Sequence, residues 1–393
     1  MYIAIASGYG GQKVSEFKHY LYENNQGKFT KKQLPVPPFI ASVIRPFDYN
    51  HDGYPEIFIG ARVKKGVFPS SEYSWIIKND KGRLKSDTSS RFYPGMVTDA
   101  VWTDYDKDGW EDLLVTSEYN SLFLLKNING QMLVPQEIPE LYNQHGFWYS
   151  IVAADFDKDG DDDYIIGNLG ENNSYSLGHE YPLNLYAIDL DMDGILDPIR
   201  SAYWKDDQGR MNEYPVNYLD ELREQSSYFN TKFRDYSSFS RTSMEDIMTK
   251  EMYKRLEFKL HVNTCSSYIL WNDKASFRWE KLPQAVQVSP ITKMLVTDLN
   301  GDTYPDVLLG GNDYTYEVGV GYFDASKGFV LINNGKFKEK NKSAFEVLTP
   351  AQSGLFLQGM VQSLLYFNGD TSLVVAGINR SKPLVFKQIS GKK

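Results

Sequence analysis

Five short segments of the chain place oxygen-bearing side chains at alternate positions of a tight turn. They are DYNHDGYPE, DYDKDGWED, DFDKDGDDD, DLDMDGILD and DLNGDTYPD, which begin at residues 48, 104, 155, 189 and 298. We call them loops one to five. Carboxylate and amide oxygens, with no His or Cys at the alternating positions, form a hard ligand set that suits Ca²⁺ rather than zinc or copper. The spacing therefore predicts calcium in these loops.

The predicted ligands are the side chains at positions 1, 3, 5 and 9 of each loop, together with the carbonyl of position 7. The side chains are Asp48, Asn50, Asp52 and Glu56; Asp104, Asp106, Asp108 and Asp112; Asp155, Asp157, Asp159 and Asp163; Asp189, Asp191, Asp193 and Asp197; and Asp298, Asn300, Asp302 and Asp306. Loop five has Thr303 where the others have glycine, and loop one has Asn50 and Glu56 in place of aspartates. We expect about three to five ions, most clearly in loops two, three and four.

An EF-hand is an alternative calcium motif, because it also begins D-x-D-x-D-G. It requires a Glu at position 12 and a helix on each side. Position 12 here holds Ile59, Val115, Ile166, Arg200 and Leu309. Acidic turns that are merely solvated are a second alternative. However, 21 of the 51 acidic residues lie in the five loops, so their repulsion would be costly without a cation, and five Ca²⁺ ions would offset the formal charge of −9.

The apolar runs around the loops predict the fold. Each loop follows a run such as SVIRPF or SIVAA and precedes one such as IFIG or YIIG, so each copy forms a strand–loop–strand hairpin. Degenerate copies occur at MYIAIASGYG and LLYFNGDTSLVVAGIN. Seven units of roughly 48 residues predict an all-β, seven-bladed β-propeller, with residues 1–393 as a single domain. Closing the ring would hide the sheet edges.

A segment of different character interrupts the repeats at residues 205–259. Thr242 and Glu245 have the spacing of a capping box, and Ile247, Met248 and Met252 fall near one helical face. The sequence therefore predicts a helical insertion of two or three short helices within the propeller. We expect it to carry partner or ligand specificity, with simple decoration of a blade as the alternative.

Composition excludes several classes of protein. A formal charge of −9 argues against nucleic acid as a partner, because phosphate binding requires a basic face. No apolar run approaches the roughly eighteen residues of a transmembrane segment. The opening MYIAIASGYGG does not have the pattern of a signal peptide. Cys265 is the single cysteine, so no intrachain disulfide can form.

The loops resemble the FG-GAP/VCBS calcium-binding repeats of integrin-α-like β-propellers. The chain also resembles the propeller portion of bacterial ASPIC/UnbV-type VCBS repeat proteins, through strings such as MVTDAVWTDYDKDG, WYSIVAADFDKDGDDDYIIGNLGENN and SPITKMLVTDLNGD. This resemblance implies a seven-bladed propeller, calcium in the loops and a binding or scaffolding role. It also implies export, to the periplasm, the cell surface or the extracellular space.

Aromatic side chains beside amides predict a surface that binds a glycan or a protein. Aromatic rings stack on sugars and amides bond to their hydroxyl groups. The candidates are Trp148, Tyr149, Asn168, Asn172, Trp204, Tyr314 and Tyr316. The alternative is that Trp148 and Tyr149 pack between blades and that Asn168 caps a turn.

Two other functions remain open from the sequence. One is a polysaccharide lyase or hydrolase on a propeller scaffold, and the other is a structural subunit of a larger outer-surface complex. No G-x-S-x-G or H-E-x-x-H motif occurs, and we assign no catalytic residue. His145 and His179 are the histidines that a catalytic role would use, although a structural role explains them as well. The sequence thus favours a calcium-binding module for a glycan or protein ligand.

Overall fold

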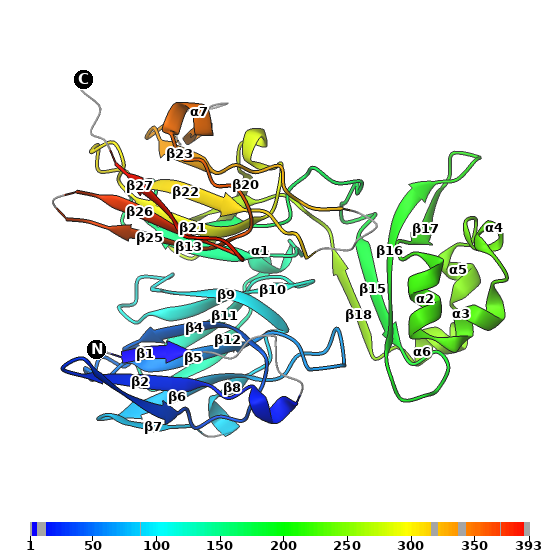
Figure 1. The fold of residues 1–393 in the computed structure, drawn as a ribbon, viewed down its shortest axis with the longest axis horizontal. Helices are drawn as coiled ribbons and strands as arrows, with labels where there is room; N and C mark the ends of the chain where they lie inside the picture. The colour runs from blue at the N-terminus through cyan, green and yellow to red at the C-terminus, as the bar shows by residue number, and fades with distance from the viewer. Residues whose placement is uncertain are drawn as a thin grey trace.

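The protein is mostly β-structure. The computed structural model describes residues 2–5, 13–86, 88–315, 321–336, 343–369 and 371–388. These residues form seven sheets in which every neighbouring pair of strands is antiparallel (Figure 1). Within the described part of the chain, no helix is long and apolar enough to cross a membrane.

The N-terminal half of the fold is built from three of these sheets. They contain β1 (Tyr2–Ile5), β2 (Tyr20–Asn25) and β3 (Lys28–Gln33); β4 (Ala41–Phe47), β5 (Glu56–Ala61), β6 (Ser74–Asp80), β7 (Arg83–Lys85) and β8 (Arg91–Phe92); and β9 (Met96–Thr103), β10 (Asp112–Glu118), β11 (Phe123–Ile128) and β12 (Met132–Gln136). The short helix α1 (Pro139–Tyr142) follows β12.

The other four sheets use the rest of the chain. They contain β13 (Ser150–Ala154), β14 (Asp163–Gly167), β19 (Tyr268–Asp273) and β20 (Ser276–Lys281); β15 (Leu183–Ile188), β16 (Asp197–Lys205), β17 (Met211–Pro215) and β18 (Phe258–Val262); β21 (Ile291–Thr297), β22 (Asp306–Gly311), β23 (Phe329–Asn333) and β24 (Phe345–Leu348); and β25 (Val361–Phe367), β26 (Leu373–Ile378) and β27 (Leu384–Lys387). Helix α7 (Pro350–Ser353) lies between β24 and β25.

Each acidic loop joins two antiparallel strands, as the sequence predicts. The pairs are β4–β5, β9–β10, β13–β14, β15–β16 and β21–β22. The degenerate C-terminal copy forms the pair β25–β26 in the same way. The strand that follows loops one, two, three and five is buried along nearly its whole length, because sheets pack on both of its faces. In the hairpin of loop four the fully buried strand is instead β15, which precedes the loop.

In three of the sheets, one asparagine makes a link to the sheet before it. Asn127 lies in β11, the third strand of the sheet that contains loop two. Its Nδ2 donates to the carbonyl of Tyr49 in loop one at 2.9 Å. Asn272 reaches Tyr105 of loop two in the same way at 2.8 Å. Asn333 reaches the carbonyl of Phe156 in loop three at 2.7 Å. Loops one, two, three and five therefore lie next to one another along one edge of the packed sheets.

Loop four lies outside this row, which corrects the order expected from the repeats. The segment SYILWND follows loop four in the sequence, where the repeats place the third strand of its sheet, but it is β19 and pairs with β14 after loop three. The chain leaves this sheet after Gly167 and returns at Tyr268, and between these points it builds the separate sheet β15–β18. Figure 1 shows this inserted unit in green, beside the other sheets.

Five short helices, more than the two or three expected, pack on the inserted sheet. They are α2 (Leu219–Gln225), α3 (Ser227–Lys232), α4 (Tyr236–Phe239), α5 (Met244–Ile247) and α6 (Lys250–Lys254). The single helix predicted to open at Thr242 is instead the pair α5 and α6. Ser243 caps the first and Thr249 caps the second, and Met248 between them has an extended backbone. Met248 is nevertheless buried against the sheet, in the cluster that joins it to the helices.

Candidate metal loops and ligand groove

Each loop is folded around its first aspartate. In loop three, Asp155 accepts the backbone N–H groups of Asp159 and Gly160, both at 3.1 Å. Lys158 and Gly160 adopt left-handed φ values of 59° and 101°, which glycine tolerates and most side chains disfavour. The corresponding bonds form in loops one, two and four. Loop five keeps the left-handed turn even though Thr303, with φ 73°, replaces the glycine.

The acid at position 9 is buried in every loop. Its relative exposure does not exceed 1% in Glu56, Asp112, Asp163, Asp197 and Asp306. In loop three, Asp163 accepts the backbone N–H of Asn272 at 2.9 Å and that of Phe156 at 3.2 Å. Burial raises the pKa of Asp163 to about 8. This carboxylate therefore fastens the loop to the third strand and still requires neutralisation.

Carboxylates converge in the three loops that the sequence favoured. The candidate ligand atoms lie within 4.8 Å of one another in three groups: Asp104, Asp106 and Asp108; Asp155, Asp157 and Asp163; and Asp189, Asp191 and Asp197. Loops one and five contain an amide instead, and it bonds within its own loop. Asn50 Nδ2 donates to Glu56 at 3.2 Å, and Asn300 Nδ2 donates to Asp302 at 2.9 Å.

Buried oxygen atoms without partners test whether a cation fits these loops. Oδ1 of Asp197, Oδ2 of Asp112 and Oε2 of Glu56 are buried and accept no hydrogen bond from the described residues. Burial raises the pKa of Asp197 to about 6 and that of Asp112 to about 7. An orphaned buried carboxylate oxygen is costly unless a proton or a cation satisfies it. The donor set therefore fits a hard cation such as Ca²⁺.

Loop two differs from the others because it already holds a positive charge. Lys126 extends from β11, and its Nζ lies 2.7 Å from an oxygen of Asp106 and 2.6 Å from Oδ2 of Asp108. The same Nζ lies 3.7 Å from Oδ1 of Asp112. Sequence reasoning missed Lys126, since only the pairing of β10 with β11 brings it into the loop.

The two extra aspartates of loop three, Asp161 and Asp162, bond to neighbouring strands. Asp161 is 3% exposed and accepts the backbone N–H of Lys274 at 2.8 Å. Asp162 accepts the hydroxyl of Thr103 at 2.9 Å, which connects loop three to the preceding sheet. These two carboxylates therefore help to hold neighbouring strands together.

The predicted ligand-binding residues separate into two sets. Trp148 and Asn168 are fully buried, so they do not face a ligand. The Trp148 indole donates to the carbonyl of Asn120 at 2.7 Å, and the Asn168 amide bonds to backbone groups around it. Tyr149 is half-buried and packs against a core cluster. Tyr316 lies outside the described residues.

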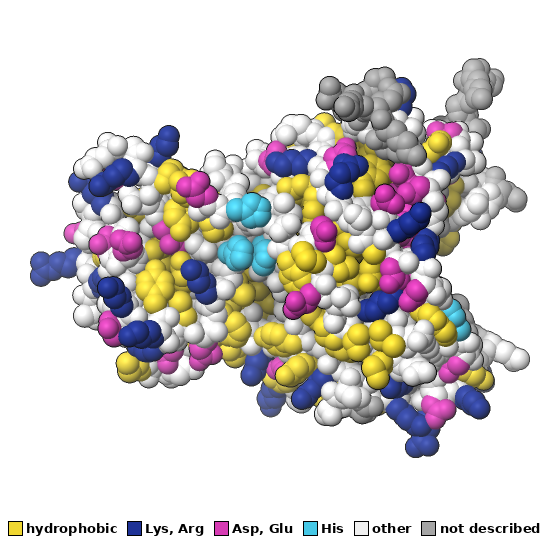
Figure 2. Space-filling model, turned by 180° about the vertical axis from the view of Figure 1, so that it is seen from behind, with side chains coloured by type: hydrophobic (Ala, Val, Ile, Leu, Met, Phe, Trp, Pro, Cys, Tyr) yellow, Lys and Arg dark blue, Asp and Glu magenta, His cyan; other side chains and the backbone are white. Residues whose placement is uncertain are grey.

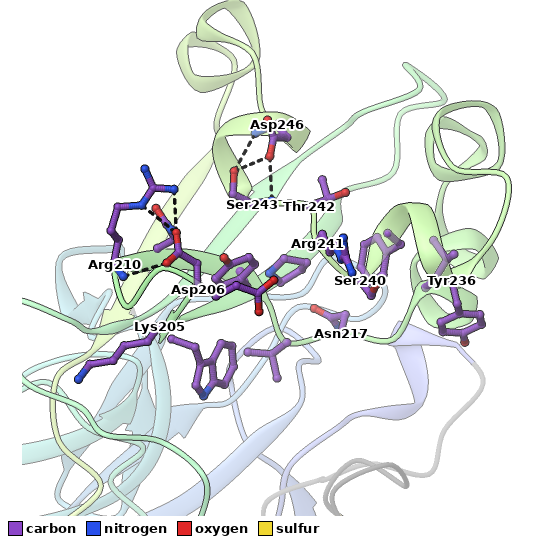
Figure 3. A pocket seen from close by; sticks show the side chains of 18 of the residues that line it. Lys205, Asp206, Arg210, Asn217, Tyr236, Ser240, Arg241, Thr242, Ser243 and Asp246 are labelled. Carbon is purple, nitrogen blue, oxygen red and sulfur yellow. Dashed lines mark hydrogen bonds and ion pairs between the residues drawn. The ribbon is translucent and has the colours of Figure 1, made fainter.

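Trp204, at the end of β16, lines two adjoining clefts. The first has a volume of about 940 Å³ and lies between the β16–β17 hairpin and the helices. In Figure 3, Asp206 and Arg210 project from the hairpin side, and Tyr236 and Arg241 lie on the helical side. The second cleft, of about 560 Å³, separates the inserted unit from the segment 321–325. We call the two clefts together the groove.

The groove contains aromatic residues that sequence reasoning did not single out. Trp204 and Tyr218 belong to both clefts, and Tyr175 and Tyr322 line the second together with the predicted Asn172. These residues come from segments far apart in the sequence, so no local motif marks them. Just beyond the groove, the ring of the predicted Tyr314 lies 5.2 Å from that of Tyr322.

Three of the five histidines gather beside the inserted unit. Figure 2 shows histidine side chains at the surface between this unit and the other sheets. The rings of His145 and His261 stack at 4.1 Å, and Nδ1 of His179 lies 3.0 Å from the amide nitrogen of Asn263. Burial lowers the pKa of His145 to about 4. These contacts match the structural alternative for His145 and His179.

The repeat geometry agrees with a family match. Residues 104–166, which contain loops two and three, match the FG-GAP-like repeat. This part of the chain therefore carries the FG-GAP-like repeat. No curated protein matches it over its sequence.

Several solved structures share a distant likeness with this chain. Saccharomyces cerevisiae Sqt1 is 13% identical with a TM-score of 0.41, over 99% of this chain and 84% of that one. The BP39L lectin from Burkholderia pseudomallei is 8% identical with a TM-score of 0.36, over 100% and 96%. The V. cholerae biofilm matrix protein Bap1 is 12% identical with a TM-score of 0.33, over 92% and 72%. At these scores, none of the three supports a functional argument.

Proposed function

We propose that this protein is a calcium-binding β-propeller that acts at the cell surface or after secretion as a binding module for a glycan. The observation that carries the proposal is the groove around Trp204. A glycan site requires aromatic faces, polar groups that fix orientation, and a concave surface. Tryptophan and tyrosine rings supply the faces, and Asn172, Asn212 and Asn217 supply amides along the same walls.

Charge supports a polar ligand for the groove over an apolar one. Asp206 is held by Arg210, whose Nε donates to it at 2.9 Å, and Asp246 accepts the hydroxyl of Ser243 at 2.7 Å. Arg241 lines the first cleft from the segment between α4 and α5. Such a mixture of paired charges, amides and rings matches sugar hydroxyls. A protein ligand is the alternative occupant.

Calcium has a structural role in this proposal. The ligands are the acids and amides at positions 1, 3, 5 and 9 of the loops, with loops three and four as the best sites because their carboxylates converge and lack a nearby lysine or arginine partner among the described residues. A bound Ca²⁺ would neutralise each loop and fasten the hairpin to the neighbouring strands. We propose no catalytic step for it.

In our proposal, the sheets other than β15–β18 are the blades of the propeller. The sequence predicted seven blades, and seven sheets are described, but the sheet β15–β18 is inserted between β14 and β19. We therefore propose a propeller whose ring uses the other six sheets, with β1–β3 and β25–β27 as its terminal blades. The inserted unit is then an appendage that builds the groove.

A glycan array probed with the calcium-loaded protein tests the binding role. We expect binding to one class of glycan, and we expect Trp204→Ala to abolish it. Trp110→Ala is the matched control, because Trp110 is also a half-buried tryptophan but stacks on His51 away from the groove. Equal binding by Trp204→Ala and the native protein would contradict the groove. Binding of a protein from the native cell surface but of no glycan would favour the alternative ligand.

A further inference from the structure

A second cavity lies among the sheets, apart from the groove and the acidic loops. The first strands β4, β9, β13, β21 and β25 surround a space of about 380 Å³. It connects to a wider mouth of about 680 Å³, lined by Arg62, Glu118 and Asn312 near the ends of the second strands. Because the acidic loops join the opposite ends of these hairpins, the mouth opens on the other edge of the row.

Two of the cations in this cavity and its mouth are already paired. Arg45 forms an ion pair with Asp99, and its Nε also donates to the carbonyl of Ala100 at 2.8 Å. Asp99 accepts backbone N–H groups as well, from Ala100 at 2.8 Å and Ile151 at 3.3 Å. At the mouth, Arg62 forms an ion pair with Glu118. Both arginines are therefore committed to the scaffold.

Lys293 is different, because it enters the cavity without a partner. It lines both the inner cavity and the mouth. Among the residues that the structure describes, no oxygen accepts a hydrogen bond from its Nζ and no carboxylate pairs with it. The acid whose charge acts on Lys293 is Asp99, which already forms an ion pair with Arg45. Burial lowers the pKa of Lys293, as expected for a charge that has lost water without gaining a full counter-charge.

Gln362 stands beside this lysine with its amide also uncommitted. Its side chain lines the same two spaces from β25, and it makes no hydrogen bond to the described residues. Two hydroxyl groups of the inner strands are occupied by comparison. Ser150 donates to the carbonyl of Ile291 at 2.7 Å, and Thr292 donates to that of Val361 at 3.1 Å. Among the described residues, the cavity thus presents the ammonium of Lys293 and the amide of Gln362 as free donors, beside the hydroxyl of Ser363.

We propose that the cavity binds a small organic monoanion, with its carboxylate on Lys293 and Gln362. A carboxylate accepts hydrogen bonds from both donors and balances the one unpaired charge of the inner cavity. A phosphate dianion would leave an excess negative charge instead. Asp313 lies at the rim, where the backbone and hydroxyl of Thr315 both donate to it at 2.7 Å, and it selects further against multiply charged ligands.

L-Lactate is the first probe, and its uncharged amide, lactamide, is the matched control. Calorimetric titration of the calcium-loaded full chain is expected to show lactate binding, with lactamide at least about tenfold weaker, since a charged hydrogen bond contributes about 1.5–3 kcal/mol. Neither compound is a glycan, so this result does not depend on the groove. Equal binding of the two, or no binding of lactate, overturns the proposal.

Variants locate the site. Lys293→Met should weaken lactate binding by about tenfold or more, and Gln362→Leu by about threefold. Lys281→Met is the control and should bind lactate normally, because Lys281 pairs with Glu171 on the surface. Lys293→Arg keeps the charge, so it should retain binding if the methionine variant folds poorly. Native affinity in a folded Lys293→Met protein, or preferential binding of inorganic phosphate, contradicts the assignment.

Discussion

Loops two and three share the residues DxDKDG, yet they handle their negative charge differently. The difference in charge arises at one position in the third strand of each sheet. This position comes directly before the asparagine whose backbone bonds to the buried acid of the loop. In loop two it is Lys126, whose ammonium contacts Asp106 and Asp108. In loop three it is Trp271, whose indole donates to Glu280 at 2.9 Å and brings no charge.

The consequence is a difference in what each loop still requires. No lysine or arginine of the described chain pairs with Asp155, Asp157 or Asp163 of loop three. Burial, with the charge of Asp159, raises the pKa of Asp157 to about 6. Loop three therefore leaves its carboxylates without a positive side chain, which suits the external cation of our proposal, whereas loop two is partly neutralised by the protein itself. A repeat motif thus specifies the turn, and one residue on the next strand decides whether the turn needs metal.

Removal of calcium should have the largest effect on stability, because it leaves every loop without an internal cation unneutralised. At roughly 1 mM free calcium and dissociation constants of about 10⁻⁴–10⁻³ M, each site adds about 0.4–1.4 kcal/mol. Four open loops then contribute about 2–6 kcal/mol, so a chelator should lower the melting temperature by roughly 2–8 °C. Thermal melts with and without chelator measure this. A melting curve that does not change, on protein shown to be metal-free, would refute the structural role.

The next largest effect should be a difference between equivalent substitutions in loops two and three. Asp157→Asn in loop three should remove one bound calcium and about 0.4–1.4 kcal/mol of stability in calcium. Asp106→Asn in loop two should leave the metal content unchanged, because Lys126 already occupies that position. Elemental analysis after dialysis gives the stoichiometry. If both variants lose one ion, Lys126 does not exclude calcium.

Lys126→Met should make loop two resemble loop three, with no positive side chain among its carboxylates. The variant keeps the length of the side chain but frees Asp106, Asp108 and Asp112 for a cation. We expect one additional calcium ion per chain and, in calcium-free buffer, a loss of about 1–3 kcal/mol from the unpaired buried acid. A stoichiometry equal to that of the native protein would show that loop two cannot hold metal even without its lysine.

Thr303→Gly should give the smallest effect, by making the turn of loop five like that of loop three. Thr303 has φ 73°, a conformation that costs a β-branched residue about 1–2 kcal/mol. The substitution also removes the contact of its hydroxyl with Lys158, so we expect a net gain of about 0–1 kcal/mol in chemical denaturation. Lys158→Met measures the lost contact separately. A destabilised Thr303→Gly protein would mean that this contact outweighs the strain.

Much of the fold and of the metal loops could be predicted from the sequence, because these features are local. The five hairpins follow from apolar runs on either side of a turn, and the turn follows from aspartates that bond to backbone groups four and five residues away, as Asp155 does. The burial of Asp163 was not predicted, but its place among the candidate ligands was. Ser243 and Thr249 likewise mark helix starts, although the break at Met248 between them was missed.

Only the tertiary structure decided which segments meet. The residues of an apolar strand such as β19 do not show whether it pairs with β14 or with β16. The displacement of loop four could therefore not be predicted from the repeats. The same holds for side chains: Trp148 and Trp204 have similar local surroundings in the sequence, but one is enclosed by other sheets and the other lines the groove. Lys126 enters loop two through strand pairing. Spacing along the chain determines a turn, whereas burial and charge balance depend on residues that only the folded chain brings together.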